Sequence, residues 1–153
     1  MPNTYSQIYI QIVFAVKGRE NLIKESFRDE LEKYMSGIVS GKNQKLLAIY
    51  CMSDHTHLLI GLRPSMSVAD LVRDIKSNSS AFISEKGFVK GRFAWQEGYG
   101  AFSYSKSQLD NVIHYILNQP IHHQKKTFRD EYIDFLQKFQ IDYDEKFLFE
   151  WIV

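Results

Sequence analysis

The chain has 153 residues, of which 44% are hydrophobic and 24% charged, a composition that suits one compact domain over residues 1–153 and excludes a disordered chain. Its net charge of +1 excludes a nucleic-acid partner held by a globally basic surface, so such a partner would need local basic clusters and aromatic stacking. The single cysteine, Cys51, excludes an internal disulfide framework, and the lack of a signal-peptide pattern or a membrane-length apolar run predicts a soluble cytoplasmic protein without a membrane partner.

The first half of the chain predicts three strands and one helix. Residues 5–16 alternate between polar and apolar side chains, which is the pattern of a strand with one buried face. Residues 21–42 have apolar side chains at helical spacing, and Gly41 is a suitable stop for that helix. Residues 45–52 and 55–62 then predict two strands joined by a short turn, so the histidine-containing segment opens the second arm of a hairpin.

A second helix and a last strand follow the hairpin. Ser67 and Asp70 form a capping signal, and apolar residues at helical spacing continue to Gly87. Residues 87–100 contain four of the eight glycines, which predicts a loop that leads into a short strand over 101–104.

The last third of the chain predicts two further helices. Ser107 and Asp110 repeat the capping signal before a helix over about 107–119, which Pro120 should end or kink because proline removes a helical donor. Thr127 and Asp130 begin the final helix, and the aromatic side chains of the tail as far as Trp151 are expected to pack on the surface of the domain or of a dimer.

The order strand, helix, strand, strand, helix, strand predicts an α+β fold of the ferredoxin-like (RRM-like) type. Its core covers about residues 5–105, with the helix at 107–119 and the C-terminal helix and tail at about 127–153 added to it. Both core helices pack on one face of the antiparallel sheet. The other face is expected to be open and to carry the polar side chains of the first strand together with the two histidines, as RNA-recognition domains use such a face for bases.

The segment SDHTHLLI places His55 and His57 one residue apart in a predicted strand. Side chains alternate across a strand, so the two imidazoles point to the same face and could hold a metal ion together. Histidines with ordinary hydrogen bonds are also common in sheets, so the pair alone leaves both interpretations open. A metal site needs a third ligand. No cysteine is placed to supply it, and the remaining imidazoles are His114, His122 and His123.

Tyr115 and Gln119 are spaced i, i+4 on a predicted helix, so their side chains lie on one face of it. The pair supplies a phenol beside an amide oxygen. The alternative interpretation is a boundary aromatic next to a solvated residue near the end of a helix.

Three segments, SDHTHLLI, WQEGYGAFSYS and HYILNQPIHH, following IYIQIVFAVKGR, together resemble the HUH single-tyrosine transposases of small bacterial insertion sequences, the IS200-like family with its REP-associated relatives. The resemblance runs from about Tyr5 to Tyr143. It implies that Tyr115 is the nucleophile and that His55, His57 and Gln119 hold a divalent metal, Mg²⁺ or Mn²⁺.

Three positions bear on the match. Thr56 stands where the family usually has a bulky apolar residue and Ser53 where proline is common, and Pro120 directly after Gln119 can shift the end of the helix.

The resemblance implies a DNA transposase that cleaves and rejoins single-stranded DNA at the ends of a mobile element through a 5′-phosphotyrosine intermediate, without ATP. The implied partners are DNA with subterminal hairpins and a second copy of the chain. The tyrosine helix can complete the histidine site of its own chain (in cis) or that of the other copy (in trans). No nucleotide cofactor is expected, which agrees with the absence of a P-loop motif. Trp95 and Tyr99 could stack on bases or hold their loop, and the basic residues expected to contact phosphates are Lys86, Lys90, Arg92, Lys106, Lys125, Lys126 and Arg129.

Two alternatives remain at this point. A non-catalytic protein with an RRM-like open sheet could bind single-stranded or hairpin nucleic acid. A metal enzyme acting on a small molecule through the histidine pair ranks last, because the sequence has no signature of an apolar pocket.

Overall fold

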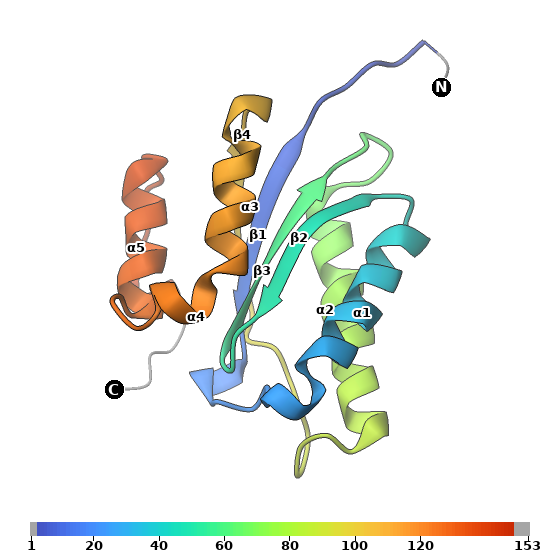
Figure 1. Cartoon of the computed structure of the whole chain (residues 1–153), viewed down its shortest axis with the longest axis vertical. Helices are drawn as coiled ribbons and strands as arrows, with labels where there is room; N and C mark the ends of the chain where they lie inside the picture. Colours follow the sequence, from blue (N-terminus) through green and yellow to red (C-terminus); the bar gives the residue numbers. More distant parts are fainter. Residues whose placement is uncertain (1–2, 149–153) are drawn as a thin grey trace.

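The computed structural model describes residues 3–148 and has an α+β fold around one four-stranded antiparallel sheet (Figure 1). The strands are β1 (Tyr9–Ala15), β2 (Lys45–Cys51), β3 (His55–Gly61) and β4 (Gly100–Tyr104), in the order β2-β3-β1-β4. This order, with β1 and β3 central, is the ferredoxin-like topology that the sequence predicts. No helix in the described part of the chain is long and apolar enough to cross a membrane.

Helices α1 (Glu25–Gly41) and α2 (Val68–Lys86) cover one face of the sheet, as predicted (Figure 1). Ile12 and Phe14 of β1 are fully buried under them, together with Leu31 and Met35 of α1. Thr56 also lies on this face, where its hydroxyl group is 3.2 Å from the Cys51 sulfur and donates to the Tyr50 carbonyl. The unusual residue between the two histidines therefore affects packing against α1 and α2, on the side of β3 away from the imidazoles.

The other face of the sheet, which the sequence argument left open, is covered by α3 (Leu109–Leu117), α4 (Gln119–His122) and α5 (Phe128–Lys138) (Figure 1). Val112 and Ile116 of α3 pack on Leu59 of β3. The predicted apolar stripe of α5 packs on Val13 and Phe102 of the sheet. The expectation that this face is open was therefore wrong, because α3 and α5 have enough apolar side chains to bury it.

The predicted helix over 107–119 is divided in the structure. A short 3-10 turn, Lys106–Gln108, precedes α3, and α3 ends at Leu117. The capping box belongs to Ser105 and Gln108, so the prediction of Ser107 and Asp110 as the cap was wrong. Pro120 lies in the first turn of α4, where its missing N–H group costs nothing.

The other two predicted caps are confirmed. Ser67 accepts a hydrogen bond from the Asp70 amide, and Thr127 accepts one from the Asp130 amide, at 3.1 and 3.2 Å. The tail forms a 3-10 turn at Glu145–Phe147, where Phe147 is 80% exposed, while the neighbouring Leu148 contacts the cluster beneath α5. Trp151, which belongs to the aromatic segment predicted to pack, lies outside the described residues.

Gly100 lies at a close approach between β4 and α5. A Cβ atom at this position would lie 2.9 Å from the Phe102 ring and 2.9 Å from the Tyr132 hydroxyl oxygen, and both neighbours are buried. We expect Gly100→Ala to reduce the free energy of unfolding by roughly 1–3 kcal/mol, measured by urea denaturation. The matched control is Gly37→Ala in α1, where a Cβ meets nothing within 4 Å, and it should be neutral or stabilising. Equal effects of the two substitutions would contradict the packing argument.

Candidate metal centre and tyrosine site

The two histidines of β3 lie beneath the helices of the second face. In the register of β3 with β1, His55 is opposite Ala15 and His57 is opposite Val13. Both imidazoles therefore point to the side of α3 and α5, and their exposed fractions are 1% and 0%. Their rings are 5.2 Å apart between centroids.

Each of these imidazoles has one nitrogen fixed by an oxygen. The Nδ1 atom of His55 is 2.7 Å from the Asp54 carboxylate, which can only accept, so Nδ1 carries the proton. The Nδ1 atom of His57 is 2.8 Å from the side-chain oxygen of Gln11, whose amide group donates to the hydroxyl of Tyr104. The Nε2 atom of each ring therefore faces away from these oxygens and toward the interior of the site, as in metal-ligating histidines held by a second layer of hydrogen bonds.

A third imidazole, that of His123, comes from the residue after α4. Its Nδ1 atom donates to the Lys126 carbonyl at 2.8 Å, so its Nε2 atom also presents a lone pair. The rings of His55 and His123 are 4.8 Å apart. Burial lowers the pKa of His55, and burial together with the nearby imidazole of His55 lowers the pKa of His123 to about 3, so both rings are neutral at pH 7.

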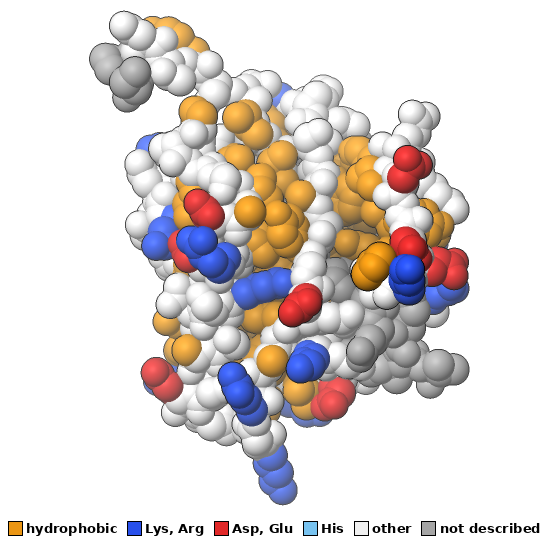
Figure 2. Space-filling view, turned by 180° about the vertical axis from the view of Figure 1, so that it is seen from behind, with side chains coloured by type: hydrophobic (Ala, Val, Ile, Leu, Met, Phe, Trp, Pro, Cys, Tyr) orange, Lys and Arg blue, Asp and Glu red, His pale blue; other side chains and the backbone are white. Residues whose placement is uncertain are grey.

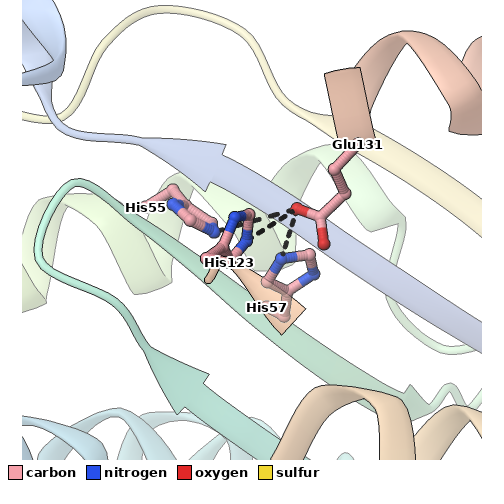
Figure 3. Close-up of side chains that lie close together, drawn as sticks. All are labelled: His55, His57, His123 and Glu131. Atoms are coloured by element: carbon pink, nitrogen blue, oxygen red, sulfur yellow. Dashed lines mark hydrogen bonds and ion pairs between the residues drawn. The ribbon is translucent and has the colours of Figure 1, made fainter. Parts of the chain in front are cut away.

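Glu131 of α5 completes the cluster (Figure 3). Its Oε1 atom is 3.2 Å from His57 Nε2, 3.3 Å from His123 Nε2 and 3.8 Å from His55 Nε2. Figure 3 shows the three imidazoles and the carboxylate pointing toward one another from three separate segments. One ligand atom from each of the four side chains lies within 4.8 Å of the others.

The donor set fits a divalent cation. His55 Nε2 is buried and has no hydrogen-bond partner among the described residues, although such atoms are normally satisfied. Ligands that share one first-row cation at about 2.0–2.2 Å lie roughly 3–3.5 Å apart, close to the separations around Glu131. Three imidazoles and a carboxylate could therefore hold a metal here.

Tyr115 of α3 borders this cluster. Its hydroxyl group donates a hydrogen bond to Glu131 Oε2, and the same carboxylate oxygen is 3.2 Å from His122 Nε2. The Tyr115 ring is 5.9 Å from the His57 ring. The phenol and the histidine pair that the sequence singled out are thus neighbours within one chain.

Gln119 is fully buried at the start of α4. Its side-chain oxygen is 2.8 Å from His123 Nε2, and its amide nitrogen is 3.3 Å from Glu131 Oε2. The residue expected to be the third ligand therefore lies in the cluster, where its amide nitrogen donates to Glu131 Oε2 and to the Tyr115 carbonyl and its side-chain oxygen faces His123. The helix break before it changes which groups it faces.

A pocket of about 360 Å³ opens beside Tyr115, between α3 and α5. Its lining combines rings with charged and amide side chains, which suits a polar ligand with an aromatic part. The lining includes Tyr104, Asn111, Tyr115, His122, Lys126, Phe135 and Lys138.

The predicted phosphate contacts are spread over several elements. Lys126 lines the pocket beside Tyr115 and pairs with Asp134. Arg92 lines a second, larger hollow of about 720 Å³, between α2 and the loop before β4. The other five are exposed: Lys86, Lys90, Lys106, Lys125 and Arg129. On the face shown in Figure 2, Lys and Arg side chains are scattered among Asp and Glu side chains.

The two aromatic residues of the glycine-rich loop have different environments. Trp95 is 9% exposed, and its indole N–H group donates to Ser79 at 2.9 Å, so it holds the loop against α2. Tyr99 is 37% exposed and lines the larger hollow.

Fold and site together define an α+β protein whose sheet carries a paired-histidine centre beside a tyrosine. A family model described as "Transposase IS200 like" matches residues 4–119. The chain therefore belongs to the IS200-like transposase family, a family of DNA transposition and mobile elements.

Individual relatives agree with this assignment. The transposases for insertion sequence element IS200 from Salmonella typhimurium and Salmonella typhi are each 30% identical over 93 residues, or 58% of this chain and 61% of the relative. The match thus covers less than two thirds of their length.

Two solved structures share the fold. One, from Deinococcus radiodurans R1 and described as a candidate transposase, is 24% identical with a TM-score of 0.63 and covers 76% of this chain and 94% of its own. The other, a REP-associated tyrosine transposase bound to a REP hairpin, is 14% identical with a TM-score of 0.59. The match covers 79% of this chain and 72% of the other chain.

Sequence reasoning missed Glu131, Gln11 and Asp54 and left His123 among several remaining imidazoles. One signal was available for Glu131. It interrupts the apolar stripe of α5, since it is three residues after Phe128 and four before Phe135, and a carboxylate on a buried helix face requires a partner.

Proposed function

We propose that this chain is a metal-dependent, ATP-independent transposase that cleaves and rejoins single-stranded DNA, with Tyr115 as the nucleophile. The observation that carries the proposal is the position of the Tyr115 hydroxyl, bonded to a carboxylate of the buried His–Glu cluster in a chain of the IS200-like family. The same function accounts for the pocket of about 360 Å³ that opens at this tyrosine.

The bond changes balance without an external energy source. The Tyr115 oxygen forms a bond to the scissile phosphorus, the bond from phosphorus to the 3′ oxygen breaks, and the proton lost by the phenol is matched by the one gained by the 3′ hydroxyl. The product is a 5′-phosphotyrosine with a free 3′-OH. Because one phosphoester replaces another, the reverse attack by a 3′-OH can rejoin the strand.

A divalent cation supplies polarisation of a non-bridging phosphate oxygen in this chemistry. The residues that the family resemblance assigns to it are His55, His57 and Gln119. A phenol with an ordinary pKa of about 10 is mostly protonated at neutral pH, so an acceptor such as Glu131 also helps to orient the hydroxyl toward its target. Either Mn²⁺ or Mg²⁺ can serve, and Mn²⁺ accepts imidazole more readily.

The substrate that we propose is single-stranded DNA with a subterminal hairpin at the end of a mobile element. A structural neighbour of 14% identity is described as bound to a REP hairpin, which supports this class of ligand. Lys126 and Lys138 line the pocket at Tyr115 and are placed to contact phosphates, and Lys86, Lys90, Arg92, Lys106, Lys125 and Arg129 are further candidates. A homodimer and a cytoplasmic location complete the proposal.

Incubation of the purified protein with single-stranded hairpin DNA and Mn²⁺ tests this function. We expect a covalent adduct that survives denaturing electrophoresis, with mass spectrometry locating the DNA on Tyr115. Tight binding without a covalent product on any hairpin substrate would instead support the non-catalytic nucleic-acid-binding alternative.

A further inference from the structure

We infer that Glu131 and His123 bind the metal together with His55 and His57, and that Glu131 connects this metal to the nucleophile through its two carboxylate oxygens. The inference deepens the proposed function, on which it rests for the role of Tyr115. It replaces the expected ligand set of two histidines and Gln119 with four side chains of one chain: His55, His57, His123 and Glu131.

The side of the cluster around Glu131 Oε1 is rich in acceptor atoms. The Nδ1 atoms of His55, His57 and His123 are each bonded to an oxygen, at 2.7, 2.8 and 2.8 Å. The three Nε2 atoms therefore converge on Glu131 Oε1, which is itself an acceptor. Acceptor atoms brought this close in a buried site repel one another unless protons or a metal cation lie between them, and one metal ion would satisfy all four.

His55 Nε2 is a buried polar atom without a hydrogen-bond partner in the described part of the chain. A histidine that merely filled space in the sheet would have both nitrogens satisfied. Here the Asp54 carboxylate holds one side of the ring at 2.7 Å, while the other nitrogen faces the cluster. Such an arrangement is typical of a metal-ligating histidine.

The two carboxylate oxygens of Glu131 face different parts of the site. Oε1 faces the imidazoles of His57 and His123 at 3.2 and 3.3 Å. Oε2 faces the other way, where it accepts the hydrogen bond of Tyr115. With Oε1 on the metal, Oε2 would hold the phenol beside it, so one carboxylate would set the distance between the two reactive parts of the site.

The identity of the expected metal follows from the ligands. Three imidazoles and one carboxylate form a nitrogen-rich set, whereas Mg²⁺ prefers oxygen ligands and retains water. Mn²⁺ should therefore bind more tightly than Mg²⁺ at this site.

The test measures Mn²⁺ binding without DNA, by calorimetry and by the loss of the electron paramagnetic resonance signal of free Mn²⁺. We expect Glu131→Gln, which keeps the size of the side chain, to weaken Mn²⁺ affinity by roughly 10–100-fold. His123→Ala should weaken it similarly, and the double variant should bind more weakly than either single variant, since both remove ligands of one ion. The matched control is Asp130→Asn, at an exposed position of the same helix, which should bind like wild type.

Stability measurements separate a lost ligand from a damaged fold. Without metal, Glu131→Gln removes a buried charge from among acceptors, so its melting temperature should equal or exceed that of wild type, while stabilisation by Mn²⁺ should require roughly 10–100-fold more Mn²⁺. Wild-type Mn²⁺ affinity in both Glu131→Gln and His123→Ala would overturn the inference. Metal loss in these variants, combined with a DNA adduct that persists in Tyr115→Phe, would overturn the proposed nucleophile and leave the metal set standing.

Discussion

Tyr115→Phe should eliminate the covalent DNA adduct and reduce strand cleavage by roughly 10³-fold or more, because it removes the only atom of this side chain that can attack phosphorus. The substitution removes one hydroxyl group and keeps the ring that packs near Phe135. The fold and the imidazole cluster should therefore persist. The measurement is the rate of adduct formation on a labelled hairpin substrate with saturating Mn²⁺.

Tyr34→Phe is the matched control for this experiment. Tyr34 belongs to α1, on the opposite side of the sheet, where its ring contacts Phe82. It should form adduct at the wild-type rate. An adduct of undiminished yield in Tyr115→Phe would show that another group attacks the DNA and would refute the assignment.

His57→Ala should lose both metal binding and cleavage. His57 is fully buried, and its Nε2 atom is 3.2 Å from Glu131 Oε1, so the substitution would delete a proposed ligand and leave a cavity. We expect Mn²⁺ affinity to fall by about 100-fold or more, and the adduct rate to fall with it at low Mn²⁺ concentration. A titration of adduct rate against Mn²⁺ concentration measures both effects.

His114→Ala provides the comparison for this loss. His114 is exposed on α3, and its side chain contacts Asn118 outside the imidazole cluster. It should titrate with Mn²⁺ like wild type. If His57→Ala kept the wild-type dependence on Mn²⁺ and lost only thermal stability, His57 would be a packing residue and no ligand.

Much of the fold follows from local patterns. The alternation in residues 5–16 correctly separates Ile12 and Phe14, beneath α1 and α2, from Gln11 on the other face. The caps at Ser67 and Thr127 follow from short-range chemistry. The cap before α3, which belongs to the 3-10 turn Lys106–Gln108, was misplaced because Ser105 with Gln108 and Ser107 with Asp110 offer the same local signal two residues apart.

The covering of the second face could not be read from local patterns. Apolar stripes on α3 and α5 show that each helix needs a partner surface, but they do not say which surface. Val13 and Leu59 give the sheet a second apolar face, but in the sequence each stands between apolar residues that belong to the first face.

The site was predictable only in part, for a similar reason. The period of a strand is enough to place His55 and His57 on one face. Glu131 contacts His57 across 74 residues of sequence, and this contact depends on how α5 docks. Gln119 was expected one turn after Tyr115 on a continuous helix, whereas the structure begins a new helix at that residue.

The interruption between α3 and α4 has a mechanical consequence. Pro120 has no N–H group for the Ile116 carbonyl, so the segment with Tyr115 and the segment with Gln119 and His123 are two short rods joined near Asn118. The position of Tyr115 is therefore set by how α3 packs on the sheet, and that of His123 by the turn after α4. In the proposed function, the nucleophile and this metal ligand would be held by two separate short elements.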